Sequence, residues 1–246
     1  MSETDRKVKD IEKFNHWTGV DKKVEMSSAP GGQPTEALPL GKLNVRRILF
    51  LGNSITLHGP RKEVSWTGNW GMAASCLEND YVHVLTREIA EKAGERPDIM
   101  VKNIASLERE QATYDIPGNL QEQIDFRPNV LILAIGENAP QPDTPEAREC
   151  FHKVLHDLLA AFTGTGKPRI FVRSSFWPNE IKDTILKEVC AESGGTFVDI
   201  GELSKDESNF ARSEREYEHS GVAAHPGDGG MKAIAAAILK AMTAAK

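Results

Sequence analysis

The sequence predicts an α/β protein built as a three-layer αβα sandwich, with one parallel sheet between two layers of helices. Two observations carry this prediction. From Val45 onward, short apolar runs alternate with segments of helical periodicity, which is the pattern of repeated strand and helix units. The apolar runs are also nearly continuous, as expected for strands that are covered on both faces. The length of 246 residues suits one large domain with a sizeable core.

Five strands and five helices are expected in this alternation. The strands are rich in Val, Ile, Leu or Phe, and the last helix begins at Asp228, which can serve as its N-cap. The expected strands are 45–51, 99–105, 130–135, 169–174 and 196–200, and the expected helices are 81–93, 120–125, 145–162, 179–192 and 228–244.

Residues 1–44 show no clear period, and we expect them to form an N-terminal arm or linker ahead of a domain at 45–246. The run SSAPGGQPTEALPLG is rich in turn-forming residues, as a connector would be. Phe14 and Trp17 are the large anchors that precede it. The start of this arm is expected to be flexible.

Composition and charge exclude several classes of protein. Hydrophobic residues make up 39% and charged residues 27% of the chain, which is ordinary for a folded protein and excludes a disordered one. The 30 basic and 36 acidic residues give a net charge of −6 without a basic run, so nucleic acid is not an expected partner. The sequence contains neither a run of 18 apolar residues nor a signal-peptide core, so no membrane association is expected. We expect a soluble protein, cytoplasmic as the chain stands, or periplasmic or secreted if a leader is removed.

The sequence indicates no metal or cofactor. Cys76, Cys150 and Cys190 are far apart and show no CxxC spacing, which favours neither a disulfide framework nor a zinc site. His152 and His156 share a helix face, but no carboxylate completes a zinc motif. No glycine fingerprint for a nucleotide follows any expected strand.

Three polar residues follow expected strands at the carboxyl edge of the sheet, where ligands bind in open α/β folds. Ser54 lies just past the first strand, Asn138 past the third, and His225 in the loop after the fifth. A serine can attack an ester, a histidine can accept its proton, and an asparagine can donate to an oxyanion. Taken singly, they are more often a helix cap, a turn residue and a structural histidine. The stretch GNSIT also lacks the second glycine of the G-x-S-x-G elbow, which disfavours the usual α/β-hydrolase site.

Two connections, 58–80 and 205–224, are longer than the fold requires, and long ordered loops tend to be functional. The first follows Ser54 directly and carries Trp66 and Trp70. These indoles could wall a substrate pocket, or they could simply pack the loop onto the domain.

The three motifs together resemble the SGNH (GDSL-like) hydrolase family, whose sequence blocks have this order and spacing. They are GNSIT after the first strand, GEN after the third and HPGDGGMKAIA before the last helix, and the resemblance covers about 45–246. It implies a flavodoxin-like sandwich with a five-stranded parallel sheet. It also implies that Ser54 is the nucleophile and His225 the base. By the same resemblance, the Ser54 backbone amide and the Asn138 side chain are oxyanion donors.

Two of the sequence's departures from the family pattern bear directly on the chemistry of the site. The aspartate that normally precedes the histidine by three residues is Val222 here, so the orienting acid is missing. Glu218, Glu216 or Asp228 could replace it, or a serine-histidine dyad could use a backbone carbonyl.

The second departure is Glu108, which stands where the family usually has a glycine whose amide completes the oxyanion hole. The Glu108 amide can still donate, whereas its carboxylate would oppose an oxyanion unless it points away. This carboxylate could instead bind substrate hydroxyls or orient a basic group.

The resemblance implies a serine esterase that removes a short acyl group, most simply acetyl, from a carbohydrate or another polar alcohol through an acyl-enzyme. Its expected partner is a small-molecule or glycan ester. The alternative is a non-catalytic carbohydrate-binding or scaffold protein on the same fold, with Val222 and Glu108 marking lost activity. The sequence leaves the oligomeric state, the sugar and the acyl group open.

Overall fold

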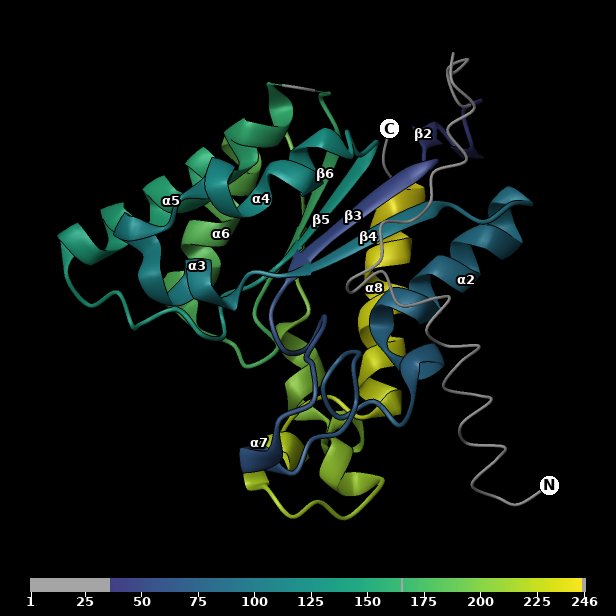
Figure 1. Cartoon of the computed structure of the whole chain (residues 1–246), viewed down its shortest axis with the longest axis vertical. Coiled ribbons are helices and arrows are strands. Elements are labelled where there is room, and N and C mark those ends of the chain that lie inside the picture. The colour runs from purple at the N-terminus through teal and green to yellow at the C-terminus, as the bar shows by residue number, and fades with distance from the viewer. Residues whose placement is uncertain (1–35, 165, 245–246) are drawn as a thin grey trace. The chain divides into compact units, whose positions relative to one another are not determined.

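The computed structural model describes residues 36–164 and 166–244, so Phe14 and Trp17 of the expected arm lie outside the described residues. The described part contains one five-stranded sheet flanked by helices (Figure 1). No helix in this part of the chain combines the length and the apolar character that a membrane span requires.

The five strands of this sheet are all parallel and lie in the order β4-β3-β5-β6-β7. This is the order of a flavodoxin-like sheet, and it confirms the predicted fold class. Gly52 lies opposite both Asn103 and Ala134. These three residues are the last of β3, β4 and β5, so the three strands stop at the same edge of the sheet. The strands are β3 (Arg47–Gly52), β4 (Asp98–Asn103), β5 (Val130–Ala134), β6 (Arg169–Arg173) and β7 (Thr196–Val198).

Helices cover both faces of the sheet, because successive residues of each buried strand point to opposite sides. Ile48 and Phe50 pack against α2 and α8, whereas Leu49 and Leu51 pack against the helices of the other layer. Figure 1 shows α2 and α8 on one side of the sheet and α3 to α6 on the other. The helices are α2 (Tyr81–Ala93), α3 (Ala105–Glu110), α4 (Ile116–Asp125), α5 (Pro145–Thr163), α6 (Glu180–Glu192), α7 (Ser220–Ala223) and α8 (Asp228–Ala244).

The segment after β4 differs from the expectation of a strand through residue 105. Asn103 ends the strand, because its side-chain oxygen accepts the backbone N–H of Ala105 at 2.9 Å and turns the chain. Helix α3 then begins at Ala105. The local sequence ASLERE has no side-chain N-cap, so no start signal marks this helix.

A short hairpin precedes the sheet and packs on its core. It consists of β1 (Pro39–Leu40) and β2 (Leu43–Asn44), which pair antiparallel. Leu38, Leu40 and Leu43 are buried against the α2 and α8 layer. The compact unit therefore begins at Glu36, before the expected boundary at Val45.

Candidate active site

Ser54 is presented by a tight turn at the carboxyl edge of β3. A Cβ atom on Gly52 would lie 1.9 Å from Thr56 Oγ1, so only glycine fits where the strand ends. The carbonyl of Asn53 then accepts the N–H groups of Thr56 at 3.0 Å and Leu57 at 2.9 Å. No helix begins at this turn, so Ser54 does not cap one in the structure. The turn leaves the half-buried Ser54 hydroxyl at the sheet edge.

His225 reaches Ser54 from the other end of the chain. Its Nε2 atom lies 2.8 Å from Ser54 Oγ, and its Nδ1 atom lies 2.6 Å from the carbonyl oxygen of Gly221. A carbonyl can only accept a hydrogen bond, so Nδ1 carries the proton and Nε2 of the neutral ring is the acceptor. The Gly221 carbonyl belongs to the short helix α7, and the backbone of His225 bonds to Ala211 at 2.9 Å. Ser54 and His225, paired by prediction, are thus in contact.

The surroundings of His225 favour its neutral form. Burial lowers the pKa of the imidazole below its ordinary 6.5, while the hydrogen bond to Gly221 opposes this shift in part. The nearby Glu137 carboxylate also raises the pKa, and the His58 imidazole lowers it. The net direction is downward, which favours the neutral imidazole at neutral pH.

Sequence reasoning missed Trp177, which packs edge-on against His225 with ring centroids 5.3 Å apart. Trp177 is half-buried and follows β6, at the same sheet edge as Ser54. The sequence did offer a signal for Trp177. It lies four residues past the end of an apolar strand, between Phe176 and Pro178. Its ring thus lies beside the serine-histidine pair.

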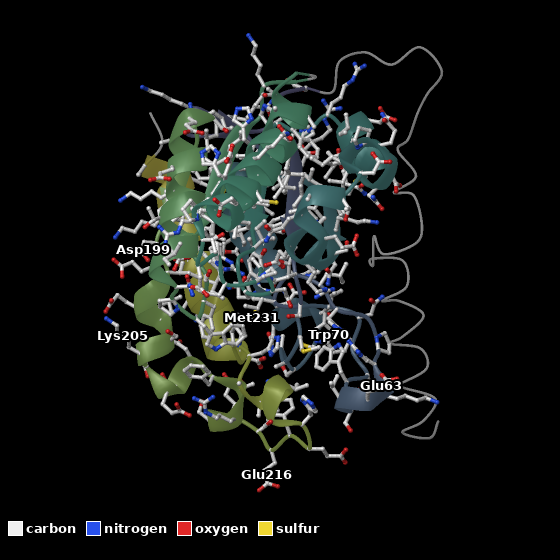
Figure 2. All side chains as sticks on the ribbon, turned by 90° about the vertical axis from the view of Figure 1, so that its left-hand side faces the viewer. Glu63, Trp70, Asp199, Lys205, Glu216 and Met231 are labelled. Carbon is white, nitrogen blue, oxygen red and sulfur yellow. The ribbon has the colours of Figure 1, made fainter. Side chains whose placement is uncertain are left out.

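The structure brings no carboxylate to His225 Nδ1 among the described residues, because the Gly221 carbonyl occupies that direction. Val222, at the position of the family aspartate, is 2% exposed and packs in an apolar cluster with Trp66 and Met72. Glu218 accepts a hydrogen bond from Ser65 at 2.5 Å. Glu216 is another of the three carboxylates weighed as substitutes. It lies at the outer tip of its loop (Figure 2).

Asp228, the third of those carboxylates, ties the two long loops together. It accepts hydrogen bonds from Ser75 N at 2.7 Å and Ser75 Oγ at 2.6 Å, and Arg215 lies 3.2 Å away. Its expected role as an N-cap is wrong, because it is the first residue of α8 and its own N–H donates to Glu214 at 2.8 Å. The Glu214 carboxylate also accepts the N–H of Gly229 at 2.7 Å, so Glu214 takes the capping role.

Trp66 and Trp70 pack against each other, with ring centroids 5.7 Å apart at an interplanar angle of 77°. The Trp66 indole donates to the His58 carbonyl at 2.9 Å, and that of Trp70 to the Ala74 carbonyl at 2.9 Å. Trp66 is 7% exposed. Both indoles therefore hold the 58–80 loop together, and contact with substrate stays a prediction for them.

Glu108 and Asn138 are brought together beneath the sheet edge. The Glu108 side chain is fully buried, and its Oε2 accepts a hydrogen bond from the Asn138 side-chain nitrogen at 2.9 Å. Its Oε1 accepts the backbone N–H groups of Gly136 at 2.6 Å and Asn138 at 3.0 Å. Burial and the neighbouring Glu137 raise the pKa of Glu108, while these hydrogen bonds partly offset the rise. The carboxylate is directed at the protein's own amides, and contact with a substrate stays a prediction for Glu108.

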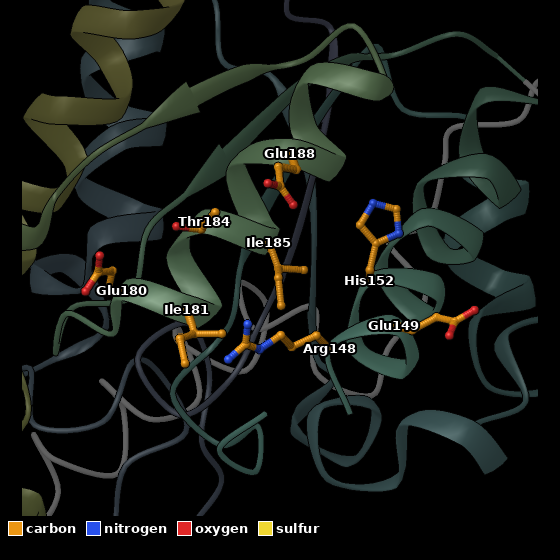
Figure 3. A pocket seen from close by; sticks show the side chains of 8 residues that line it. All are labelled: Arg148, Glu149, His152, Glu180, Ile181, Thr184, Ile185 and Glu188. Atoms are coloured by element: carbon orange, nitrogen blue, oxygen red, sulfur yellow. The ribbon is translucent and has the colours of Figure 1, made fainter. Parts of the chain in front are cut away.

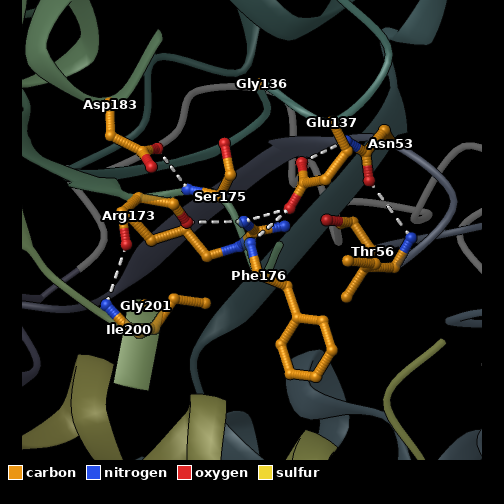
Figure 4. A network of polar contacts seen from close by, with 12 residues as sticks. Asn53, Thr56, Gly136, Glu137, Arg173, Ser175, Phe176, Asp183, Ile200 and Gly201 are labelled. Atoms are coloured by element: carbon orange, nitrogen blue, oxygen red, sulfur yellow. Dashed lines mark hydrogen bonds and ion pairs between the residues drawn. The ribbon is translucent and has the colours of Figure 1, made fainter. Parts of the chain in front are cut away.

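Glu137 and Arg173 form a buried ion pair, and sequence reasoning also missed this pair. The carboxylate contacts Arg173 Nη1 at 2.7 Å and accepts the Phe176 N–H at 2.9 Å and the Asn53 side chain at 2.7 Å (Figure 4). Burial alone would raise the pKa of Glu137, but Arg173 and these hydrogen bonds hold it below its ordinary 4.5. Asn53 is thereby fixed next to Ser54.

A separate groove of about 460 Å³ lies between α5 and α6. Arg148, His152 and Glu188 are among the residues that line it (Figure 3), and none of the predicted site residues does. Within the described ranges, no group of three or more His, Cys, Asp and Glu side chains is arranged to hold a metal ion.

Comparison with known proteins finds likeness at the level of structure. No family model and no curated protein matches the chain. The lipase/acylhydrolase from Enterococcus faecalis matches with a TM-score of 0.51 and 14% identity, over 80% of this chain and 95% of that one. Proteins described as GDSL-like lipases match from Bacteroides uniformis (TM-score 0.51, 15% identity, 79% and 94% covered) and Bacteroides ovatus (0.52, 12%, 80% and 98%). The chain therefore has the fold of the GDSL-like hydrolases.

Proposed function

We propose that the protein is a serine esterase of the SGNH type, with Ser54 as nucleophile and His225 as general base. The observation that carries the proposal is the 2.8 Å contact between Ser54 Oγ and His225 Nε2, with Nδ1 of the same ring bonded to Gly221 at 2.6 Å. A hydroxyl within hydrogen-bond reach of a neutral, oriented imidazole is the arrangement that nucleophilic catalysis needs.

The reaction proceeds in two acyl transfers. Ser54 Oγ bonds to the ester carbonyl carbon while its proton passes to His225 Nε2, and the carbonyl electrons move onto oxygen. Collapse of the tetrahedral intermediate breaks the bond to the alcohol, which takes the proton from His225. Water, activated by His225 in turn, then releases the acid from Ser54.

The developing oxyanion is stabilised by N–H donors at the sheet edge. The backbone N–H of Ser54 has no protein acceptor among the described residues. Asn138 donates one side-chain hydrogen to Glu108 and keeps a second one for substrate. The backbone amide of Glu108 is the third proposed donor. Each such donor contributes roughly 10²- to 10³-fold to the rate in serine hydrolases.

A short acyl group and a polar alcohol are the proposed substrate parts. Trp66 and Met72 are buried inside the 58–80 loop, so these apolar side chains do not line a groove for a long acyl chain. Trp177 lies half-buried beside His225 and is an aromatic surface on which a sugar ring could stack. Acetylated carbohydrates combine both features, and we propose them as the substrate class.

A serine-reactive fluorophosphonate probe tests the proposal. The folded protein is expected to form one covalent adduct, which peptide mass spectrometry maps to Ser54, and Ser54→Ala is expected to abolish it. Heat-denatured protein is the control for non-specific labelling. Folded protein that stays unlabelled and hydrolyses no aryl acetate would favour the alternative, a non-catalytic carbohydrate-binding protein.

Activity is expected to persist into mildly acidic solution. His225 must be neutral to accept the serine proton, so activity is lost as pH falls through its pKa. Because burial holds that pKa below 6.5, the acid limb of kcat/KM for a neutral aryl acetate should have its midpoint below pH 6.5. A midpoint above this value would mean that the hydrogen bond to Gly221 and the charge of Glu137 outweigh the burial of His225 in the free enzyme.

A further inference from the structure

The loop at 136–139, which carries Asn138, is held on one side by an anion. It follows β5 directly, and Gly136 has a φ of 126°, in the left-handed region that favours glycine. A Cβ atom there would lie 2.5 Å from Ser175 Oγ. The N–H groups of Gly136 and Asn138 both donate to the buried Glu108 carboxylate, at 2.6 and 3.0 Å. This unusual backbone conformation is thus stabilised by contacts from other elements.

A cation holds the other side of the same loop. Lys182, on α6, donates from Nζ to the carbonyl oxygens of Ala139 at 2.6 Å and Gly136 at 3.2 Å. The residue is only 8% exposed. The loop's N–H groups therefore meet a carboxylate from α3, and its carbonyls meet an ammonium from α6.

The burial of Lys182 is costly for the fold. Within the described part of the chain, no carboxylate lies within ion-pair distance of its Nζ atom. A buried ammonium loses its hydration, and two carbonyl oxygens replace it only in part. If this position on α6 had only to pack, an apolar side chain would be more stable. The positive charge of Lys182 is therefore best explained by its hydrogen bonds to the carbonyls of Gly136 and Ala139.

We infer that Lys182 is a positioning residue for the esterase reaction, which sets the place of the Asn138 amide through the carbonyls at 136 and 139. This inference rests on the proposed function, because it takes Asn138 as an oxyanion donor. Glu108 accepts one hydrogen of the Asn138 side chain, and Lys182 fixes the backbone from which that side chain extends. Because the amide group is planar, holding one hydrogen and the backbone also fixes the second hydrogen, which we take as the donor to the oxyanion.

The test replaces the ammonium while keeping the apolar stem. Lys182→Met is expected to lower kcat/KM for an aryl acetate and the fluorophosphonate labelling rate at least tenfold, with KM changed less than twofold, since the contact matters in the transition state. Amide hydrogen exchange at Asn138 should become faster, while exchange at Leu133 in β5 stays unchanged. Lys187→Met, at an exposed position of the same helix, is the matched control and should leave both readouts as in the wild type.

A folded Lys182→Met protein with wild-type kcat/KM and wild-type exchange at Asn138 would overturn the inference. Lys182→Arg keeps the charge and should recover most of the lost rate. If neither variant folds, Lys182 supports the fold and not the loop alone, which also overturns the inference. If the wild type neither hydrolyses esters nor labels, the proposed function fails, and exchange at Asn138 alone decides whether Lys182 positions the loop.

Discussion

Replacing His225 by alanine is expected to lower kcat/KM for an aryl acetate by roughly 10⁴-fold or more, with little change in the folded structure. The imidazole is the group within 2.8 Å of Ser54 Oγ, and without it the serine hydroxyl has no base to accept its proton. The pair works as a unit, so Ser54→Ala should cost about as much, and the double variant little more. Steady-state hydrolysis, normalised to the concentration of folded protein, measures all three.

His156→Ala is the matched control for this prediction. His156 lies on α5, and its side chain is 54% exposed. It is far along the chain from both Ser54 and His225. Its replacement should leave kcat/KM within about twofold of the wild type. A His225→Ala protein that retains a tenth of the wild-type rate would assign the base to another group, of which His58 is the nearest in sequence to Ser54.

The fold could be predicted because the relevant signals are local. The nearly continuous apolar runs of β3 and β5 indicated strands buried on both faces, and the structure confirms a parallel sheet. The bounds of α2 and α8 also agree with the prediction. In contrast, α3 was missed, because Asn103 turns the chain through a side-chain hydrogen bond that no periodicity reveals.

The candidate site could be predicted only where side chains carry it. Ser54, His225 and Asn138 are recognisable residue types at strand ends, but the partner of His225 Nδ1 is the carbonyl of Gly221. Every residue has a carbonyl, so no sequence pattern marks that one. Lys182 was missed for a different reason. Charged residues on an amphipathic helix are normally solvated, and only the tertiary structure shows that this one is buried.

The largest effect on stability is expected at Glu137. Glu137→Gln should lower the free energy of unfolding by about 3–5 kcal/mol, because it leaves the Arg173 guanidinium buried without its counter-charge. Glu137 contacts Arg173 Nη1 at 2.7 Å, and the side chains are 4% and 0% exposed. Arg173 Nε and Nη2 have no hydrogen-bond partner among the described residues. Glu108 is a second carboxylate whose charge raises the pKa of Arg173, but it acts less strongly than Glu137. Urea unfolding of both proteins at pH 7 measures the difference.

Two comparisons decide whether this loss comes from the ion pair or from any change at Glu137. Glu202→Gln removes a carboxylate from the exposed pair with Lys205 and should cost less than about 1 kcal/mol. The double variant Glu137→Gln/Arg173→Met should be more stable than Glu137→Gln alone, because it removes the orphaned charge.

The pKa of Glu137 lies below 4.5 in the folded state, so the stabilisation is complete above that pH and is lost as pH falls toward the folded pKa. If the double variant is less stable than either single variant, then packing of the Glu137 and Arg173 side chains, and not their charge, accounts for the loss of stability.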